Sequence, residues 1–231
     1  MGTLSIVGTP IGNLEDITLR ALRTLTEADV IYCEDTRVTA KLLARHAIAT
    51  PLKRLDANVE ALKAGEVGDR LEAGEHVAYV TDAGTPGISD PGSRLVAAVR
   101  ERFGEEVRIE AVPGPSALTA ALSIAGISAD PFVFLGFLPH KKGRQTMLSE
   151  IAQEPRAIVL YESTHRIGKL MGELADAIRE REVAVVREIT KRFEEVLRGD
   201  AASVHAAIEA APEHAKGEFV VIIAPVEKRR S

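Results

Sequence analysis

The sequence predicts an α/β protein of two domains, with a mainly parallel first sheet and a mixed second sheet. Short apolar runs alternate with segments of helical periodicity along the 231-residue chain, as in parallel strands covered by helices. Loops rich in glycine and proline follow four of these runs. One of them, Val112–Ser116, interrupts the alternation. We place the domain boundary there, with domains over residues 1–113 and 114–231, a size usual for single domains.

The first domain begins with a strand over residues 4–7. Asp16 is a candidate N-cap for the helix that follows, because leucines recur after it at helical spacing. The later elements then continue the alternation of strand and helix. They are expected as strands over 29–33, 76–80 and 108–111 and helices over 36–46 and 93–103.

The second domain begins with a helix over residues 117–125, whose first turn suits the preceding Pro115 and Ser116. Thr164 is expected to cap a helix that ends near Arg179, and Asp200 to cap the last helix. Two strands follow each other without a helix between them, which favours a mixed sheet. The strands are expected over 132–135, 157–161, 183–186, 194–197 and 219–223, a further helix over 143–151, and a frayed tail over 227–231.

The bulk composition is that of an ordinary soluble globular protein, with 45% hydrophobic and 27% charged residues. No apolar run approaches the ~18 residues of a membrane span, and we expect no secretory signal. The single cysteine, Cys33, excludes an internal disulfide and fits a cytoplasmic location. No metal-ligand motif is present. The net charge of −5 argues against a generic nucleic-acid binder, although a local basic face can still bind RNA.

The four glycine- and proline-rich loops are the candidate ligand site. Loops at the carboxyl ends of strands bind ligands in α/β proteins, and these loops expose backbone groups in fixed conformations. They match neither the dinucleotide-binding nor the Walker A pattern. Together they predict a ligand cleft between the domains. The loops are 7–13, 82–92, 113–116 and 136–139.

The order and spacing of six motifs resemble the tetrapyrrole-methylase superfamily of S-adenosylmethionine (SAM) enzymes. Within it, the chain is similar to the small-subunit ribosomal RNA methyltransferase I group, from Gly8 to Pro225. The motifs are Gly8–Leu14, Cys33–Arg37, Thr81–Gly92, Val112–Ala117, Gly136–Pro139 and Tyr161–Ile167.

This resemblance implies the class III SAM methyltransferase fold, with SAM in the cleft between two α/β domains, and a homodimer. It also implies methylation of the ribose 2′-oxygen of a cytidine in the decoding region of small-subunit (16S) ribosomal RNA, with the assembled subunit as the expected substrate. Thr85 stands where porphyrinoid relatives have aspartate, which favours the RNA group. Matched by position, the cofactor-binding residues are Pro10, Asp82, Ala83, Gly84, Thr85, Ile88, Ser116, Ala117 and Glu162.

The general base stays open among Glu162, Glu34 and Asp35. A ribose hydroxyl needs a positioned base, and a carboxylate can fill that role. Alternatives exist for several polar residues: Asp82 and Asp90 can shape turns, Asp35 can cap a helix, and His165 can be a surface residue or a proton relay.

The basic residues cluster along one helix face and in two loops, and each cluster is either a solvated surface or a phosphate-binding site. The candidate RNA-binding residues are Arg37, Lys41, Lys141, Lys142, Arg144, Arg166, Lys191 and Arg192. Two other functions remain open: a porphyrinoid C-methyltransferase, and a non-catalytic SAM-sensing RNA-binding module.

Overall fold

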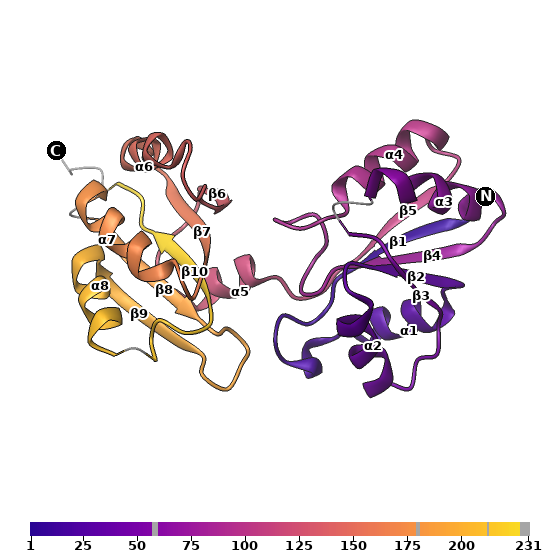
Figure 1. The fold of residues 1–231 in the computed structure, drawn as a ribbon, viewed down its shortest axis with the longest axis horizontal. Helices are drawn as coiled ribbons and strands as arrows, with labels where there is room; N and C mark the ends of the chain where they lie inside the picture. The colour runs from indigo at the N-terminus through magenta and orange to yellow at the C-terminus, as the bar shows by residue number, and fades with distance from the viewer. Residues whose placement is uncertain (57–59, 179–180, 212, 227–231) are drawn as a thin grey trace. The chain divides into compact units, whose positions relative to one another are not determined.

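The computed structural model describes residues 1–56, 60–178, 181–211 and 213–226, in two compact units, Met1–Ser116 and Ala117–Ser231 (Figure 1). The predicted tail and the predicted helix end at Arg179 lie outside the described residues. The division falls slightly after the boundary placed from the sequence because the loop before Ser116 packs on the first unit, where the Thr85 hydroxyl donates to the Pro115 carbonyl at 3.2 Å. In the described ranges, no helix is long and apolar enough to cross a membrane.

The first unit holds a five-stranded sheet in which every pair of neighbouring strands is parallel, as predicted. Its order is β3-β2-β4-β1-β5. Strand β3, which is three residues long, was not predicted from the sequence. The strands are β1 (Thr3–Val7), β2 (Val30–Cys33), β3 (Leu52–Arg54), β4 (His76–Val80) and β5 (Arg108–Val112).

Helices cover both faces of this sheet, which explains why strand β2 is buried at every position. Figure 1 shows α1 (Leu19–Glu27) and α2 (Thr36–Arg45) on one face and α3 (Glu60–Glu72) and α4 (Ser93–Phe103) on the other. Helix α3 was not predicted.

The N-cap predicted for the first helix is wrong. Asp16 lies in a short 3₁₀ turn, Leu14–Asp16. The cap of α1 is Thr18, whose hydroxyl oxygen accepts a hydrogen bond from the Ala21 N–H at 3.0 Å. The helix therefore begins at Leu19, two residues later than an Asp16 cap would place it.

The second unit holds a mixed five-stranded sheet of order β6-β7-β10-β8-β9, again as predicted. Strands β6 and β7 are parallel, and the remaining neighbours are antiparallel. The strands are β6 (Phe132–Phe137), β7 (Ala157–Ser163), β8 (Glu182–Arg187), β9 (Glu195–Asp200) and β10 (Glu218–Ile223).

Three helices pack on one face of the second sheet and α5 (Ala117–Ile124) packs on the other. Thr164 does not cap a helix: its hydroxyl group bonds the backbone N–H and C=O of Gly217, both at 2.8 Å. Asp200 caps the last helix as predicted, by accepting from the Ser203 N–H at 2.8 Å. The three helices are α6 (Arg144–Gln153), α7 (Ile167–Ile178) and α8 (Ala201–Ala210).

Candidate active site

Three of the four glycine- and proline-rich loops meet at the carboxyl edge of the first sheet. The loops after β1 and β4 pair through Thr9 and Gly84, whose backbones exchange hydrogen bonds of 2.9 and 3.1 Å. The loop after β5 packs on the loop after β1 so closely that a Cβ on Gly8 would lie 2.8 Å from the Gly114 Cα. The edge is therefore one continuous surface of backbone groups. The fourth loop belongs to the second unit.

The β4–α4 loop is held in an unusual backbone path. Gly84, Gly87, Ser89 and Gly92 all have positive φ angles, of 84°, 89°, 65° and 128°, a region that glycine enters without steric cost. The Asp90 carboxylate accepts a hydrogen bond from the Gly87 N–H. The structure thus shows Asp90 in the turn-forming role.

The loop after β2 joins the same edge through two aspartates. The Asp82 carboxylate accepts a hydrogen bond from the Asp35 backbone N–H at 3.0 Å. Asp35 in turn caps α2 by accepting from the Arg37 N–H at 2.8 Å, and it forms an ion pair with the Arg37 guanidinium at 2.5 Å. Hydrogen bonds from the Arg37 side chain hold the pKa of Asp35 well below its usual range.

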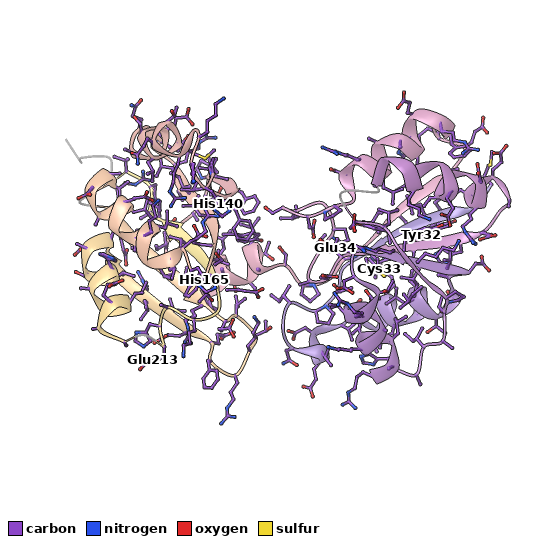
Figure 2. The ribbon with its side chains drawn as sticks, in the orientation of Figure 1. Tyr32, Cys33, Glu34, His140, His165 and Glu213 are labelled. Atoms are coloured by element: carbon purple, nitrogen blue, oxygen red, sulfur yellow. The ribbon has the colours of Figure 1, made fainter. Side chains whose placement is uncertain are left out.

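An open pocket of about 560 Å³ lies among the ends of β2, β3 and β4. Figure 2 shows Glu34 where β2 ends, next to Cys33. Burial, followed by the nearby charge of Asp82, raises the pKa of Glu34, and burial also raises the pKa of Asp82. The lining residues are Glu34, Asp35, Thr36, Arg37, Arg54, Asp56 and Asp82.

A second, smaller pocket of about 230 Å³ adjoins the first and shares Asp82 with it. It brings the predicted cofactor residue Pro10 close to the predicted phosphate contact Lys41. Most of its lining is apolar. The lining residues are Thr9, Pro10, Leu14, Val38, Thr39, Lys41, Leu42, Thr81 and Asp82.

These features combine four kinds of chemistry at one sheet edge. The exposed backbone of the loops can hold a small polar molecule, and the carboxylates can hold a cationic group. A carboxylate with a raised pKa is a stronger base than usual. Glu34 shares this property with Asp82 and Asp90, and it is the one of the three among the predicted bases. The two arginines of the larger pocket, Arg37 and Arg54, are exposed and able to bind phosphate oxygens.

Among the predicted cofactor-binding residues, Ala117 and Glu162 belong to the second unit. The Glu162 side chain is fully buried. Its carboxylate accepts from the Ser163 N–H at 2.8 Å and pairs with the Arg166 guanidinium at 3.3 Å. Arg166 also donates to the Leu138 carbonyl. The buried Glu162–Arg166 ion pair therefore stabilises the loop after β6. This burial does not suit Glu162 as a general base.

The predicted phosphate contacts divide into exposed and internal residues. Arg144 is only 4% exposed; it forms an ion pair with Glu173 at 2.6 Å and donates to the Pro139 carbonyl at 3.0 Å. Arg166 is also held internally, and Lys191 pairs with two glutamates. We therefore remove Arg144 from the candidate RNA surface. The exposed candidates are Arg37, Lys41, Lys141, Lys142 and Arg192.

The histidines His140 and His165 differ in their surroundings. Figure 2 labels His140 and His165, and both side chains are exposed. His140 lies 3.4 Å from the Arg166 guanidinium. Nothing in these contacts gives His165 a proton-relay partner among the described residues. Likewise, no group of three or more His, Cys, Asp or Glu residues is arranged for a metal in the described part of the chain.

Two charged residues of the larger pocket, Arg54 and Asp56, were not predicted from the sequence. They form an ion pair with each other. Both residues reach the pocket because strand β3 pairs with β2, which brings the end of β3 to the carboxyl edge of the sheet. The available signal was weak, because residues 52–56 are two leucines among three charged residues without strict alternation.

Comparison with known proteins identifies the family. Residues 3–205 match the family described as Tetrapyrrole (Corrin/Porphyrin) Methylases. The chain is 46% identical over 224 residues to the ribosomal RNA small subunit methyltransferase I of Xylella fastidiosa, covering 96% of this chain and 81% of that protein. The protein of the same name from Thermotoga maritima is 45% identical over 199 residues, covering 86% and 88%.

The fold is also that of a solved methyltransferase. The uroporphyrin-III C-methyl transferase of Thermus thermophilus, complexed with S-adenyl homocysteine, superposes with a TM-score of 0.64 at 22% identity, covering 96% of this chain and 97% of that chain. At this identity the likeness concerns the fold alone. From the family match and the two close relatives, the chain belongs to the tetrapyrrole methylases, a family of methyltransferases, and within them to the ribosomal RNA small subunit methyltransferase I group.

Proposed function

We propose that the protein transfers the methyl group of SAM to the ribose 2′-hydroxyl of a cytidine in the decoding region of small-subunit ribosomal RNA. The names of its relatives, at 45–46% identity, support ribosomal RNA as the substrate. The observation that carries the reaction is the larger pocket, where Glu34, with a raised pKa, lies beside Arg37 and Arg54.

The carboxyl edge of the first sheet fits SAM by its chemistry. SAM is cationic at its sulfonium and ammonium groups, and Asp82 and Asp90 place carboxyl groups at this edge. The close approach of Gly8 and Gly114 brings the backbones of the loops after β1 and β5 together with no side chain between them. The proposed contacts from the first unit are Pro10, Asp82, Ala83, Gly84, Thr85, Ile88 and Ser116. The contacts of Ala117 and Glu162 remain predictions.

SAM supplies a methyl group that is already activated on sulfur. Glu34 accepts the proton of the ribose hydroxyl as the new O–CH₃ bond forms and the S–CH₃ bond breaks, which leaves S-adenosylhomocysteine. Asp35 is a weaker base, since Arg37 lowers its pKa. Much of the acceleration comes from holding the hydroxyl in line with the methyl group. Arg37 and Arg54 bind the phosphates on either side of the nucleotide.

The remaining parts of the proposal concern assembly and location. The exposed apolar side chains Ile124, Phe132 and Phe137 of the second unit favour a homodimer. We propose the assembled small subunit in the cytoplasm as the substrate, bound in part through Lys41, Lys141 and Lys142. Sedimentation of the purified protein tests the dimer.

The experiment that tests the function offers labelled SAM and one of three acceptors: unmodified small subunits, naked ribosomal RNA, or a porphyrinoid. Label in the RNA, recovered as 2′-O-methylcytidine after digestion to nucleosides, is the expected result. Label in the porphyrinoid would make the protein a C-methyltransferase instead. SAM and RNA binding without any transfer would make it a non-catalytic module.

A further inference from the structure

The loop that joins β8 to β9, residues 188–194, extends beyond the end of the second sheet (Figure 1). Two of its residues are not glycine and yet have positive φ angles: Glu188 at 49° and Thr190 at 64°. Such a backbone costs free energy and persists only where surrounding contacts fix it. Strain of this kind is concentrated at functional sites.

Internal contacts fix the loop from beneath. The Arg187 guanidinium, which is buried, donates to the Lys216 carbonyl at 2.6 Å and to the Phe193 carbonyl at 3.3 Å. The Lys191 ammonium group binds the carboxylates of Glu188 at 2.9 Å and Glu218 at 2.7 Å. These contacts neutralise the charge of Lys191, so this residue stabilises the loop and does not bind a ligand.

The base of the loop also depends on a glycine. A Cβ on Gly217 would lie 2.5 Å from the Glu188 side chain, and Gly217 has a φ of 115°. The N–H of the next residue, Glu218, donates to the same Glu188 carboxylate at 3.0 Å. The conformation of residues 188–194 is thus set by buried or paired groups before any partner binds.

The tip of this rigid loop presents an aromatic ring and a cation to solvent. Phe193 is 62% exposed, and the Arg192 guanidinium lies 5.5 Å from its ring centroid. No carboxylate of the described residues lies within ion-pair distance of Arg192. By contrast, the exposed Phe137 packs against the ring of Tyr161 at 5.7 Å. The Phe193 ring therefore keeps a face for a ligand, and its neighbour supplies positive charge.

We propose that Arg192 and Phe193 form a stacking platform for an unpaired base of the RNA substrate. Every base offers a π-face to an aromatic ring, and arginine adds attraction to the base and its phosphate. Unpaired, unstacked nucleotides are the usual target of proteins that read RNA. Because the loop is already ordered, binding loses little conformational entropy. The inference rests on the proposed function, in which RNA is the substrate.

The test compares Phe193→Ala and Phe193→Leu with Phe193→Trp, and uses Leu19→Ala, at another exposed apolar residue, as the control. The probe is a fluorescent single-stranded fragment of small-subunit ribosomal RNA, titrated at several salt concentrations, beside a duplex of the same sequence. We expect the Ala and Leu variants to bind the single strand about tenfold more weakly. The Trp variant and the control should bind as the unaltered protein does.

Three further measurements complete the test. Arg192→Ala should reduce the slope of log affinity against log salt by about 0.7, the contribution of one phosphate contact to a single strand. RNA carrying 4-thiouridine should crosslink on irradiation to the peptide that contains Phe193. Melting temperatures should match across the Phe193 variants, because the side chain is exposed.

The outcomes separate this inference from the proposed function. If the unaltered protein methylates subunits and Phe193→Ala binds RNA equally well, the platform is wrong and the function stands. If Phe193→Ala turns a dimer into a monomer and no crosslink forms, the tip is an interface between copies and the inference falls. If the unaltered protein neither binds nor methylates RNA, the proposed function fails with it.

Discussion

The Asp82 carboxylate accepts a hydrogen bond from the backbone N–H of Asp35 at 3.0 Å. This contact joins the loop after β4 to the loop after β2, which are neighbouring strands of the first sheet. Glu34 precedes Asp35 in the chain, so the same contact fixes its position. The charge of Asp82 also contributes to the raised pKa of Glu34. Asp82 therefore has both a geometric and an electrostatic effect on the proposed base.

Asp82→Ala and Asp82→Asn separate these two effects. The Ala variant loses the hydrogen-bond acceptor, and we expect the free energy of unfolding to fall by about 1 kcal/mol and single-turnover methyl transfer to fall at least tenfold. The Asn variant keeps an acceptor oxygen and should keep its stability while lowering the pKa of Glu34. Urea unfolding and single-turnover assays measure both. Full activity in Asp82→Ala would show that the contact does not position the base.

Glu34→Gln tests the base itself. We expect methyl transfer to fall by about 10²–10⁴-fold while the Kd for SAM stays unchanged. In the unaltered protein, kcat/KM should rise with pH as Glu34 loses its proton. This rising limb should lie at a higher pH than an ordinary glutamate would give, because burial and Asp82 raise the pKa of Glu34. The residual activity of the Gln variant should lack this limb. A limb that persists in Glu34→Gln would assign the titration to another group.

The same raised pKa has a consequence for stability. The folded protein binds the Glu34 proton more tightly than the unfolded chain, so this group's contribution to stability is present at low pH and is lost as pH rises through the folded-state pKa. A neutral glutamine removes that loss. Glu34→Gln should therefore be at least as stable as the unaltered protein at neutral pH, in a comparison of urea midpoints across pH.

The carboxyl-edge loops were predictable from sequence because their signals are local. Gly84 and Gly87 mark turns by residue type alone, and the apolar runs before them mark strands. The roles of Arg144 and of strand β3 were not predictable in the same way. Arg144 follows a run of basic residues but is turned inward by Glu173, which lies far along the chain on α7. Strand β3 is too short to show periodicity and is defined by its pairing with β2.

Gly114→Ala tests whether close backbone packing forms the cofactor edge. A Cβ at this position would lie 2.7 Å from the Gly8 carbonyl oxygen, so the loops after β1 and β5 must separate. We expect at least tenfold weaker SAM binding by calorimetry and a lower melting temperature. The control is Gly65→Ala, in α3, where the added carbon meets nothing within 4 Å beyond its chain neighbours and the backbone of its own helix. That change should leave SAM binding intact and stabilise the helix by up to about 1 kcal/mol.

Lys141→Ala/Lys142→Ala and Arg144→Ala separate binding from folding within one basic run. Both lysines are exposed, so their removal should weaken RNA binding and reduce the salt slope by about 1.4 for two phosphate contacts, with no change in stability. Arg144→Ala leaves Glu173 without its buried partner and should lower the free energy of unfolding by about 3 kcal/mol. Titrations at several salt concentrations and urea unfolding give both quantities. Unchanged RNA affinity in the double lysine variant at every salt concentration would show that this loop does not contact the RNA.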